Sequence, residues 1–401
     1  MKYIIVLGDG MADEPIPSIQ GKTPLMVADT PCIDLLAKKS ELGIVHTIPE
    51  GMKPGSDTAN LSVLGYNPEK YYSGRSPLEA LSIGVDMKDT DIALRCNLVT
   101  LSLEEDFEEK TIIDHSAGEI STEEAKLLIE ALKKELEDDI YKFYLGTSYR
   151  HLTIWEHGKV IDLAQPHDIL GKIIGDYLPK EPALKNMMKR SYDILNNHPV
   201  NIERKKKGQN VANSIWFWGA GTRPALTSFE EKYGKRGAMI SAVDLLKGIA
   251  VGTKMKVVEV EGANGTLHTN YEGKARAALD VLLKENYDFV YIHVEAPDEM
   301  GHQGNTQNKI KAIEYLDYKV IKTVTVGMEE AGVDYRMLIM PDHPTPIKIR
   351  THTDDPVPYL LYDSRVTKNN PYSYNEFDAK NSGNLILKGY TIIDRLFKNP
   401  E

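Results

Sequence analysis

The stretch Ile292-His-Val-Glu-Ala-Pro-Asp298-Glu-Met-Gly-His302-Gln-Gly-Asn305 decides how the chain is organised. The apolar run from Phe289 to Val294 predicts a buried strand. Asp298 and His302 follow that strand at a spacing of i, i+4. If the chain turns helical there, the two side chains share one face and can together hold a divalent ion. The alternative is an Asp that caps a helix, with a surface His one turn later.

The composition is that of a soluble globular protein. The 401 residues are 41% hydrophobic and 27% charged, and the formal net charge is -11, which argues against nucleic acid binding. Cys32 and Cys96 are the two cysteines, so a disulfide framework and a cysteine-based metal site are excluded. No apolar run has the length of a membrane span, and the one after Met1 is too short for a signal sequence. We expect a cytoplasmic enzyme without a membrane or nucleic acid partner.

Two segments near the N-terminus place polar residues at the ends of predicted elements. Tyr3 to Leu7 predicts a buried parallel strand that ends in Gly8-Asp9-Gly10, where the glycines leave the Asp9 carboxylate clear of bulky neighbours. The segment Gly55-Ser56-Asp57-Thr58-Ala59 places Ser56 just ahead of a predicted helix. Backbone N–H groups there favour negative charge, as on a phosphorylated serine. A simple helix cap is the alternative.

A change in the pattern of predicted elements near residue 85 indicates an inserted domain. Short predicted strands and a helix that begins after Ser121 indicate a compact α+β unit over residues 85–204, between a first part, 1–84, and a second part, 205–401. Polar residues gather at the strand ends of this unit and could face an anionic substrate: Arg95, Asp114, His115, Arg150 and His151. Arg223, in a glycine-rich loop further on, could reach a phosphate.

The C-terminal part alternates strands and helices, as is typical of a parallel sheet. We expect a helix at Gly237–Ile249, a strand at Lys256–Val260 and a long amphipathic helix from about Asn308 to Glu330. The strand Arg336–Met340 ends in Pro341-Asp342-His343, and His352 lies nine residues beyond His343.

Several of these polar residues should meet at one edge of the sheet. Ligands of an open parallel sheet bind outside the carboxyl ends of its strands. Asp9, Asp298, Asp342 and His343 all follow predicted strand ends, and His302, His352 and Ser56 should lie close by. Oxygen and imidazole ligands without thiols suit Mn²⁺, Zn²⁺ or Mg²⁺. Seven candidate ligands are too many for one ion and suit a pair that clamps a phosphoryl group.

The motif set resembles the alkaline-phosphatase superfamily, and most closely its archaeal-type cofactor-independent phosphoglycerate mutases. The resemblance rests on Gly8-Asp9-Gly10, Gly55–Ala59, Asp298 through His302, Asp342-His343 and Thr351-His352-Thr353. Asp114–Gly118 and Tyr149–Leu152 extend it into the inserted unit. It implies an α/β fold with an alkaline-phosphatase-like parallel sheet flanked by helices, and an inserted smaller α+β cap domain.

The resemblance also implies roles for individual residues. One divalent ion would be held by Asp298, His302 and His352, and the other by Asp9, Ser56, Asp342 and His343. Ser56 would take the phosphoryl group. The inserted unit would close over the site as a lid and bind the substrate through His115 and Arg150, with Arg95 and Arg223 as weaker candidates. The implied reaction interconverts 3-phosphoglycerate and 2-phosphoglycerate, with Mn²⁺ first among the metals and without 2,3-bisphosphoglycerate.

Other reactions would use the same ligand set. The turn Asp342-His343-Pro344-Thr-Pro346 resembles a bacterial branch proposed to act as an alternative homoserine kinase, which would need a nucleotide donor. A phosphatase or phosphonate hydrolase would use water as the acceptor. The features that distinguish these enzymes should lie in the inserted unit. A non-catalytic binding module is disfavoured by the seven candidate ligands, and the sequence does not predict an oligomeric state.

Overall fold

The chain forms two compact units. The computed structural model describes residues 1–366 and 368–398. One unit contains Met1–Tyr72 and the chain from Ala225 onward, and the second contains Ser73–Pro224. The inserted unit is therefore wider than the 85–204 we expected from the sequence. Helix α5 (Arg75–Ser82) and strand β7 (Ser214–Thr222) belong to it, because both pack on its central strand β3 (Ile92–Leu101).

The first unit is built on a sheet with the strand order β13-β2-β12-β11-β1-β10-β8-β9. Strands β11, β1, β10, β8 and β9 are parallel to one another, whereas β12 is antiparallel to both of its neighbours. The strands of this unit are β1 (Lys2–Gly8), β2 (Glu41–Val45), β8 (Gly237–Ile240), β9 (Lys256–Val257), β10 (Phe289–Val294), β11 (Tyr335–Met340), β12 (Val357–Asp363) and β13 (Leu385–Ile386).

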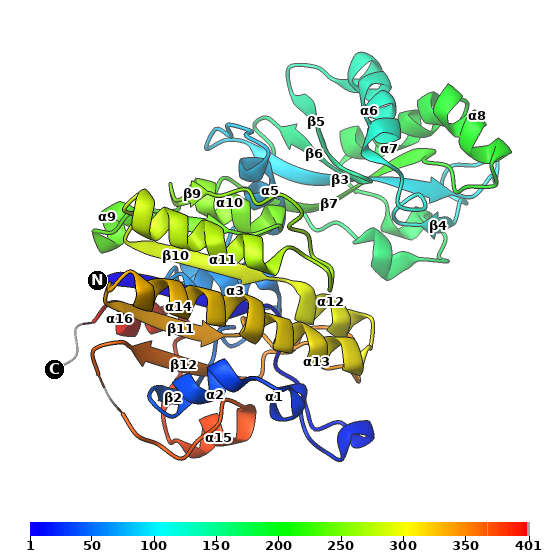
Figure 1. The fold of residues 1–401 in the computed structure, drawn as a ribbon. Coiled ribbons are helices and arrows are strands. Elements are labelled where there is room, and N and C mark those ends of the chain that lie inside the picture. Colours follow the sequence, from blue (N-terminus) through cyan, green and yellow to red (C-terminus); the bar gives the residue numbers. More distant parts are fainter. Residues whose placement is uncertain (367, 399–401) are drawn as a thin grey trace. The chain divides into compact units, whose positions relative to one another are not determined.

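Helices flank both faces of this sheet, with α11 and α14 in front and α3 behind in Figure 1. The α-helices are α1 (Pro24–Val27), α2 (Pro31–Ala37), α3 (Ser56–Val63), α4 (Pro68–Tyr71), α9 (Phe229–Tyr233), α10 (Asp244–Gly252), α11 (Tyr271–Leu279), α12 (Ala296–His302), α13 (Thr306–Tyr315), α14 (Lys322–Glu330), α15 (Glu376–Asn381) and α16 (Ile392–Phe397). Two π-helical turns, Asp280–Lys284 and Leu316–Ile321, extend α11 and join α13 to α14. Short 3₁₀ turns occur at Pro17–Ile19 and Gly389–Thr391.

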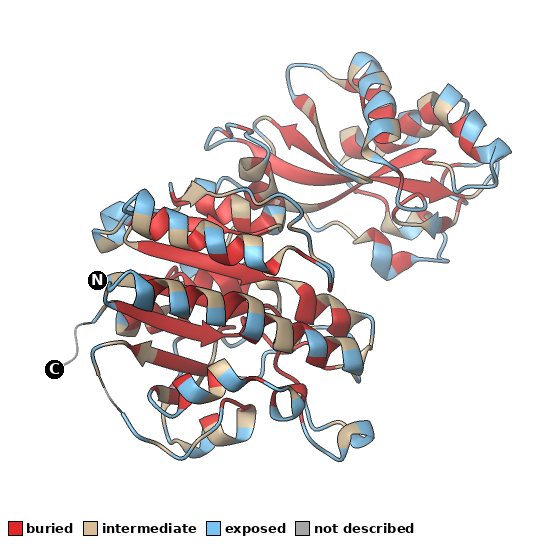
Figure 2. Cartoon of the chain, viewed as in Figure 1, coloured by how far each residue is buried: buried red, intermediate tan, exposed pale blue. Residues whose placement is uncertain are grey.

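The core of the first unit lies between its central strands and the helices. Strands β10 and β11 are buried along their whole length and β1 along nearly all of it (Figure 2). Such continuous burial is expected of parallel strands covered on both faces, and it explains their uninterrupted apolar sequences. Ile4, Ile292 and Ile339 of neighbouring strands share one hydrophobic cluster with Leu282 and Val324 of the covering helices.

One predicted element of this unit is wrong. The stretch Gly237–Ile249 forms strand β8 followed by helix α10, not one helix. Gly237 to Ile240 pairs in parallel with β10, so the short apolar run serves as a further buried strand of the sheet. The predicted helix from Asn308 to Glu330 is found as α13, the π turn and α14.

The second unit is an antiparallel sheet covered by helices. Strand β3 lies between β6 and β7, β5 pairs with β6, and β4 pairs with the end of β3. Leu128 and Leu132 of α6 and Leu184 and Met188 of α7 pack into its own hydrophobic cluster. The remaining strands are β4 (Ile112–Asp114), β5 (Tyr141–Thr147) and β6 (Arg150–Trp155). The remaining helices are α6 (Thr122–Leu136), α7 (Pro182–Leu195) and α8 (Pro199–Lys206), with 3₁₀ turns at Pro166–Ile169 and Gly175–Tyr177.

The predicted fold class, a parallel-rich α/β sheet flanked by helices with an inserted α+β unit, is confirmed. Within the described residues, no helix combines the length and apolar character that crossing a membrane requires.

Candidate metal centre

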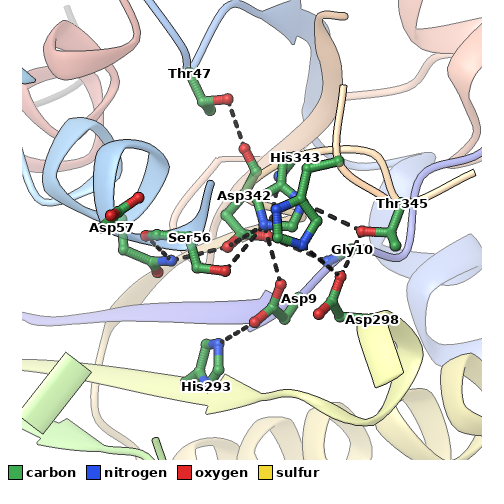
Figure 3. A network of polar contacts seen from close by, with 12 residues as sticks. Asp9, Gly10, Thr47, Ser56, Asp57, His293, Asp298, Asp342, His343 and Thr345 are labelled. Atoms are coloured by element: carbon green, nitrogen blue, oxygen red, sulfur yellow. Dashed lines mark hydrogen bonds and ion pairs between the residues drawn. The ribbon is translucent and has the colours of Figure 1, made fainter. Parts of the chain in front are cut away.

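Three adjacent parallel strands end at the candidate site. Strand β1 lies between β10 and β11, so their carboxyl ends are neighbours at one edge of the sheet. Asp9 directly follows β1, Asp298 lies in the first turn of α12 just after β10, and Asp342 and His343 follow β11. Asp9, Asp298, Asp342 and His343 are all buried. The strand order therefore brings together residues that are more than 300 positions apart, as the sequence predicted (Figure 3).

Ser56 reaches the same place from helix α3. It is the first residue of that helix, and its Oγ lies 3.0 Å from His343 Nε2. Gly55 precedes it in an extended conformation, with φ 176°. The hydroxyl thus lies at a helix N-terminus, where the dipole favours negative charge, and beside the residues that follow β11.

Two groups of side chains can each hold a metal ion. Asp9, Asp342 and His343 form one group, and Asp298, His343 and His352 form the other, with ligand atoms within 4.8 Å of one another in each group. His302 lies beside the second group, because its Nε2 is 3.2 Å from Asp298 Oδ2 and 3.0 Å from His352 Nε2. All the metal-ligand candidates from the sequence therefore converge, and His343 adjoins both groups.

Several carboxyl groups lie close together at this edge, and a bound cation would reduce the repulsion between their negative charges. Burial raises the pKa of Asp9 well above its usual value, and the nearby carboxylates of Asp342 and Asp298 raise it further. Burial would also raise the pKa of Asp298, but hydrogen bonds with His302 and His352 outweigh it and hold that pKa well below the usual range. The partner His302 has its pKa raised to about 9, first through its hydrogen bond with Asp298.

The side chains fit a divalent cation. Asp9 Oδ1 is buried and has no hydrogen-bond partner, yet it lies 3.5 Å from His343 Nε2. A buried carboxylate oxygen without a partner is costly unless a cation or a proton satisfies it. The donors are carboxylate oxygens and imidazole nitrogens, the set that suits Mn²⁺, Zn²⁺ or Mg²⁺.

Sequence reasoning missed the residues that support these ligands. Asn60, one turn after Ser56 on α3, donates from Nδ2 to Ser56 O and to Asp342 Oδ2, each at 2.8 Å. The Tyr291 hydroxyl donates to Asn60 Oδ1 and so fixes which way the amide points. Thr345 donates its hydroxyl to Asp298 Oδ1, and its Oγ1 is 3.3 Å from His343 Nδ1. The i, i+4 spacing from Ser56 to Asn60 was the one signal that could have indicated such a role.

The Gly10→Ala variant tests how tightly this edge is packed. Gly10 has φ +61°, and a Cβ there would lie 2.5 Å from both Asp298 Oδ1 and Thr345 Oγ1. We expect the variant to bind Mn²⁺ at least about tenfold more weakly and to lose about 1–3 kcal/mol of stability, because Asp298 must move. Isothermal titration calorimetry and thermal unfolding measure the two effects.

Gly21→Ala is the matched control for that variant. Gly21 has φ +71°, but nothing lies within 4 Å of its Cβ position. It should lose about 1–2 kcal/mol through backbone strain alone and keep wild-type Mn²⁺ affinity. Equal metal affinity in Gly10→Ala and Gly21→Ala would contradict the tight fit around Asp298.

The four substrate-binding candidates lie in the second unit, in different environments. Arg95 is buried in β3, 3.1 Å from Glu79 and over the ring of Trp218, and burial lowers its pKa to about 10. Arg150 is exposed at the start of β6 and stacks over Tyr149. His115 packs edge-on against Tyr149 and His167. Arg223 is exposed and pairs with Asp89 at 3.2 Å. The first three thus belong to one aromatic and cationic cluster through Trp218, Tyr149 and His167.

Comparison with known proteins shows to which family the chain belongs. A family model described as 2,3-bisphosphoglycerate-independent phosphoglycerate mutase matches residues 37–201. The chain is 47% identical over 403 residues to a probable enzyme of that name from Geobacter sulfurreducens, with 99% of each chain covered. It is also 47% identical over 404 residues to the enzyme of that name from Methanosarcina barkeri, covering 99% of this chain and 100% of that one. The chain belongs to the family of 2,3-bisphosphoglycerate-independent phosphoglycerate mutases.

Solved structures support membership of this mutase family. A protein from Pyrococcus horikoshii aligns with a TM-score of 0.81 and 29% identity, over 100% of this chain and 98% of that one. The cofactor-independent phosphoglycerate mutase from Thermoplasma acidophilum aligns with a TM-score of 0.65 and 27% identity, over 99% of each chain. Membership in this family agrees with a centre suited to divalent metal. The family name states that the reaction does not require 2,3-bisphosphoglycerate.

Proposed function

We propose that this chain interconverts 3-phosphoglycerate and 2-phosphoglycerate through a phosphoserine at Ser56. The observation that carries the proposal is the position of Ser56 Oγ, at the N-terminus of α3 and 3.0 Å from His343 Nε2, beside two groups of candidate metal ligands. The full-length similarity to curated mutases supports this reaction over the homoserine kinase and hydrolase alternatives. Phosphoglycerates are formed and consumed in central carbon metabolism, so we place the enzyme in glycolysis and in the cytoplasm.

Two divalent ions are part of the proposal, with Mn²⁺ first among the candidates. Asp9, Ser56, Asp342 and His343 would hold one ion, and Asp298, His302 and His352 the other. Bound there, the ions would lower the pKa of the Ser56 hydroxyl and screen the charge of the phosphoryl group.

The protein's own residues define the sequence of bond changes. Ser56 Oγ forms a bond to phosphorus while the bond from phosphorus to the C3 oxygen of the substrate breaks, and the serine proton ends on that oxygen. The glycerate stays bound and turns. Its 2-hydroxyl then attacks the phosphoserine, the bond from phosphorus to Oγ breaks, and the proton returns to Ser56. The N-terminus of α3 favours the anionic phosphoserine between the two steps.

An enolase-coupled assay with 3-phosphoglycerate, with and without Mn²⁺, tests the function. We expect 2-phosphoglycerate to form without added 2,3-bisphosphoglycerate. Homoserine plus ATP is assayed in parallel, together with release of inorganic phosphate. Formation of phosphohomoserine would identify the enzyme as a kinase instead of a mutase. Release of phosphate without isomerisation would identify it as a hydrolase.

Substrate binding by the second unit gives a separate prediction. An exposed guanidinium such as that of Arg150 can pair with a carboxylate or phosphate through two parallel hydrogen bonds. The Arg150→Met variant should lose about 10- to 100-fold in kcat/KM, mainly through a higher KM, because a charged hydrogen bond is worth about 1.5–3 kcal/mol. His115→Ala should act in the same direction.

Arg190→Met is the control for Arg150→Met. Arg190 is likewise an exposed arginine of the second unit, and it donates to Glu135 O on the helical side of the sheet. Its removal should leave both kinetic constants within about twofold of wild type. A normal KM in Arg150→Met would exclude Arg150 from substrate binding.

A further inference from the structure

His293 is a buried histidine in the mostly apolar strand β10, and it belongs to neither group of candidate metal ligands. It lies in β10 between Ile292 and Val294, and its side chain is fully buried. Its Nε2 lies 2.9 Å from Asp9 Oδ2, and its Nδ1 lies 3.2 Å from Ser241 Oγ. In Figure 3 the His293 ring approaches Asp9 from the β10 side, while His343 lies on the other side of that carboxylate.

The partners of His293 determine which ring nitrogen carries its proton. A carboxylate oxygen accepts, so the bond to Asp9 Oδ2 is donated by Nε2–H, and the Ser241 hydroxyl, whose oxygen accepts from the backbone N–H of Val243 at 3.0 Å, donates to Nδ1. Nδ1 is then an acceptor, and Nε2–H donates to Asp9. Lys274 Nζ donates to the His293 backbone carbonyl at 2.8 Å and holds the strand there.

The hydrogen bond from His293 gives the two oxygens of Asp9 different environments. Oδ2 is occupied by the imidazole, whereas Oδ1 is buried, has no hydrogen-bond partner and lies 3.5 Å from His343 Nε2. Oδ1 is therefore the oxygen of Asp9 that adjoins the ligand group Asp9, Asp342 and His343. A carboxylate held at one oxygen loses less rotational freedom when the other binds an ion.

We propose that His293, oriented by Ser241, is a positioning residue that presents Oδ1 of Asp9 to a divalent cation. The proposal rests on the metal centre of the proposed function and not on which phosphoryl acceptor the enzyme uses. It differs from a purely structural role, in which His293 would fill space in the core and would affect folding but not cation affinity.

Two variants that differ by one methylene test the proposal. The side-chain amide of Gln reaches as far from the backbone as Nε2 of His, whereas the amide of Asn reaches only as far as Nδ1. His293→Gln should therefore keep the donor to Asp9, and His293→Asn should lose it. Calorimetric titration of metal-stripped protein with Mn²⁺ should give a dissociation constant within about threefold of wild type for His293→Gln and about 10- to 100-fold weaker for His293→Asn.

Further variants separate positioning from packing. Ser241→Ala removes the donor that fixes the tautomer with little change in volume, and should weaken Mn²⁺ binding about 3- to 10-fold with a small change in Tm. His268→Asn, at an exposed position of the same unit, is the control and should bind Mn²⁺ as wild type does. The Tm of each metal-stripped variant reports the packing cost alone.

The outcomes distinguish failure of the positioning role of His293 from failure of the proposed metal centre or of the proposed reaction. Equal Mn²⁺ affinity in His293→Asn and wild type would overturn the positioning role. Equal losses of affinity in His293→Asn and His293→Gln, matched by equal losses in Tm, would assign His293 to packing. A wild-type protein that binds no Mn²⁺, Zn²⁺ or Mg²⁺ would overturn the metal centre and this role with it. Normal cation binding without mutase activity would count against the proposed reaction alone.

Discussion

The Ser56→Ala variant is expected to lose mutase activity by at least about 10³-fold while remaining folded. Ser56 Oγ is the atom that would form the covalent bond to phosphorus, and alanine offers no replacement nucleophile. The substitution removes one oxygen at the first position of α3 and leaves the hydrogen bond from Asn60 to the Ser56 carbonyl in place. The enolase-coupled rate and the Tm are measured together. Intact mass after brief exposure to 3-phosphoglycerate should reveal a phosphorylated form in wild type and none in the variant.

Ser62→Ala supplies a control in the same helix. Ser62 is buried in α3, and its Oγ has no hydrogen-bond partner. Removing a buried, unsatisfied hydroxyl should leave activity within about twofold of wild type and leave Tm equal or slightly higher. Wild-type turnover in Ser56→Ala would mean that the phosphoryl group does not pass through this serine.

The convergence of three candidate ligands could be predicted from the sequence, because their positions follow from the topology of the sheet. Asp9, Asp298 and Asp342 each follow an apolar run that is easily recognised as a buried strand, and parallel strands place such residues at a common edge. No knowledge of side-chain packing was needed to infer that they meet. The structure adds that His343 adjoins both ligand groups, whereas the sequence assigned it to one.

The supporting residues could not be predicted, because their roles depend on which side chains face them. His293 and Tyr291 lie in the same apolar strand, where an isolated polar residue has no recognisable pattern. The hydrogen bonds of His293 to Ser241 and Asp9, and of Tyr291 to Asn60, join residues far apart in the chain. Only the packed sheet brings these donors and acceptors together.

The domain boundary and strand β8 were misplaced for related reasons. Strand β7 pairs with β3, which lies more than a hundred residues earlier, and nothing in the local sequence of β7 reveals that partner. Gly237–Ile240 is a short apolar run, and such a run fits a helix as well as a strand until its neighbour is known. Its parallel pairing with β10 makes it a strand.

Removal of divalent cations is expected to abolish at least about 99% of the mutase activity, and added Mn²⁺ should restore it. Asp9, Asp298 and Asp342 bring three carboxyl groups into one buried edge, and Asp9 Oδ1 has no protein donor to satisfy it. The stripped protein should therefore also be less stable than the loaded one. With free Mn²⁺ at a hundredfold excess over its dissociation constant, binding adds about 2.7 kcal/mol, which corresponds to a rise in Tm of about 3 °C.

Titration of two metal-stripped aspartate variants with Mn²⁺ shows which residues the rise in Tm depends on. Asp342→Asn weakens the ligand group of Asp9, Asp342 and His343, and its Tm should respond to Mn²⁺ much less than that of wild type. Asp354→Asn changes an exposed residue in the loop that follows His343, and should retain the full response. Because the cation is predicted both to support the chemistry and to neutralise buried carboxylates, activity and Tm should return over the same range of Mn²⁺ concentration. A stripped enzyme that isomerises phosphoglycerates at full rate would show that these carboxylates do not act through a metal ion.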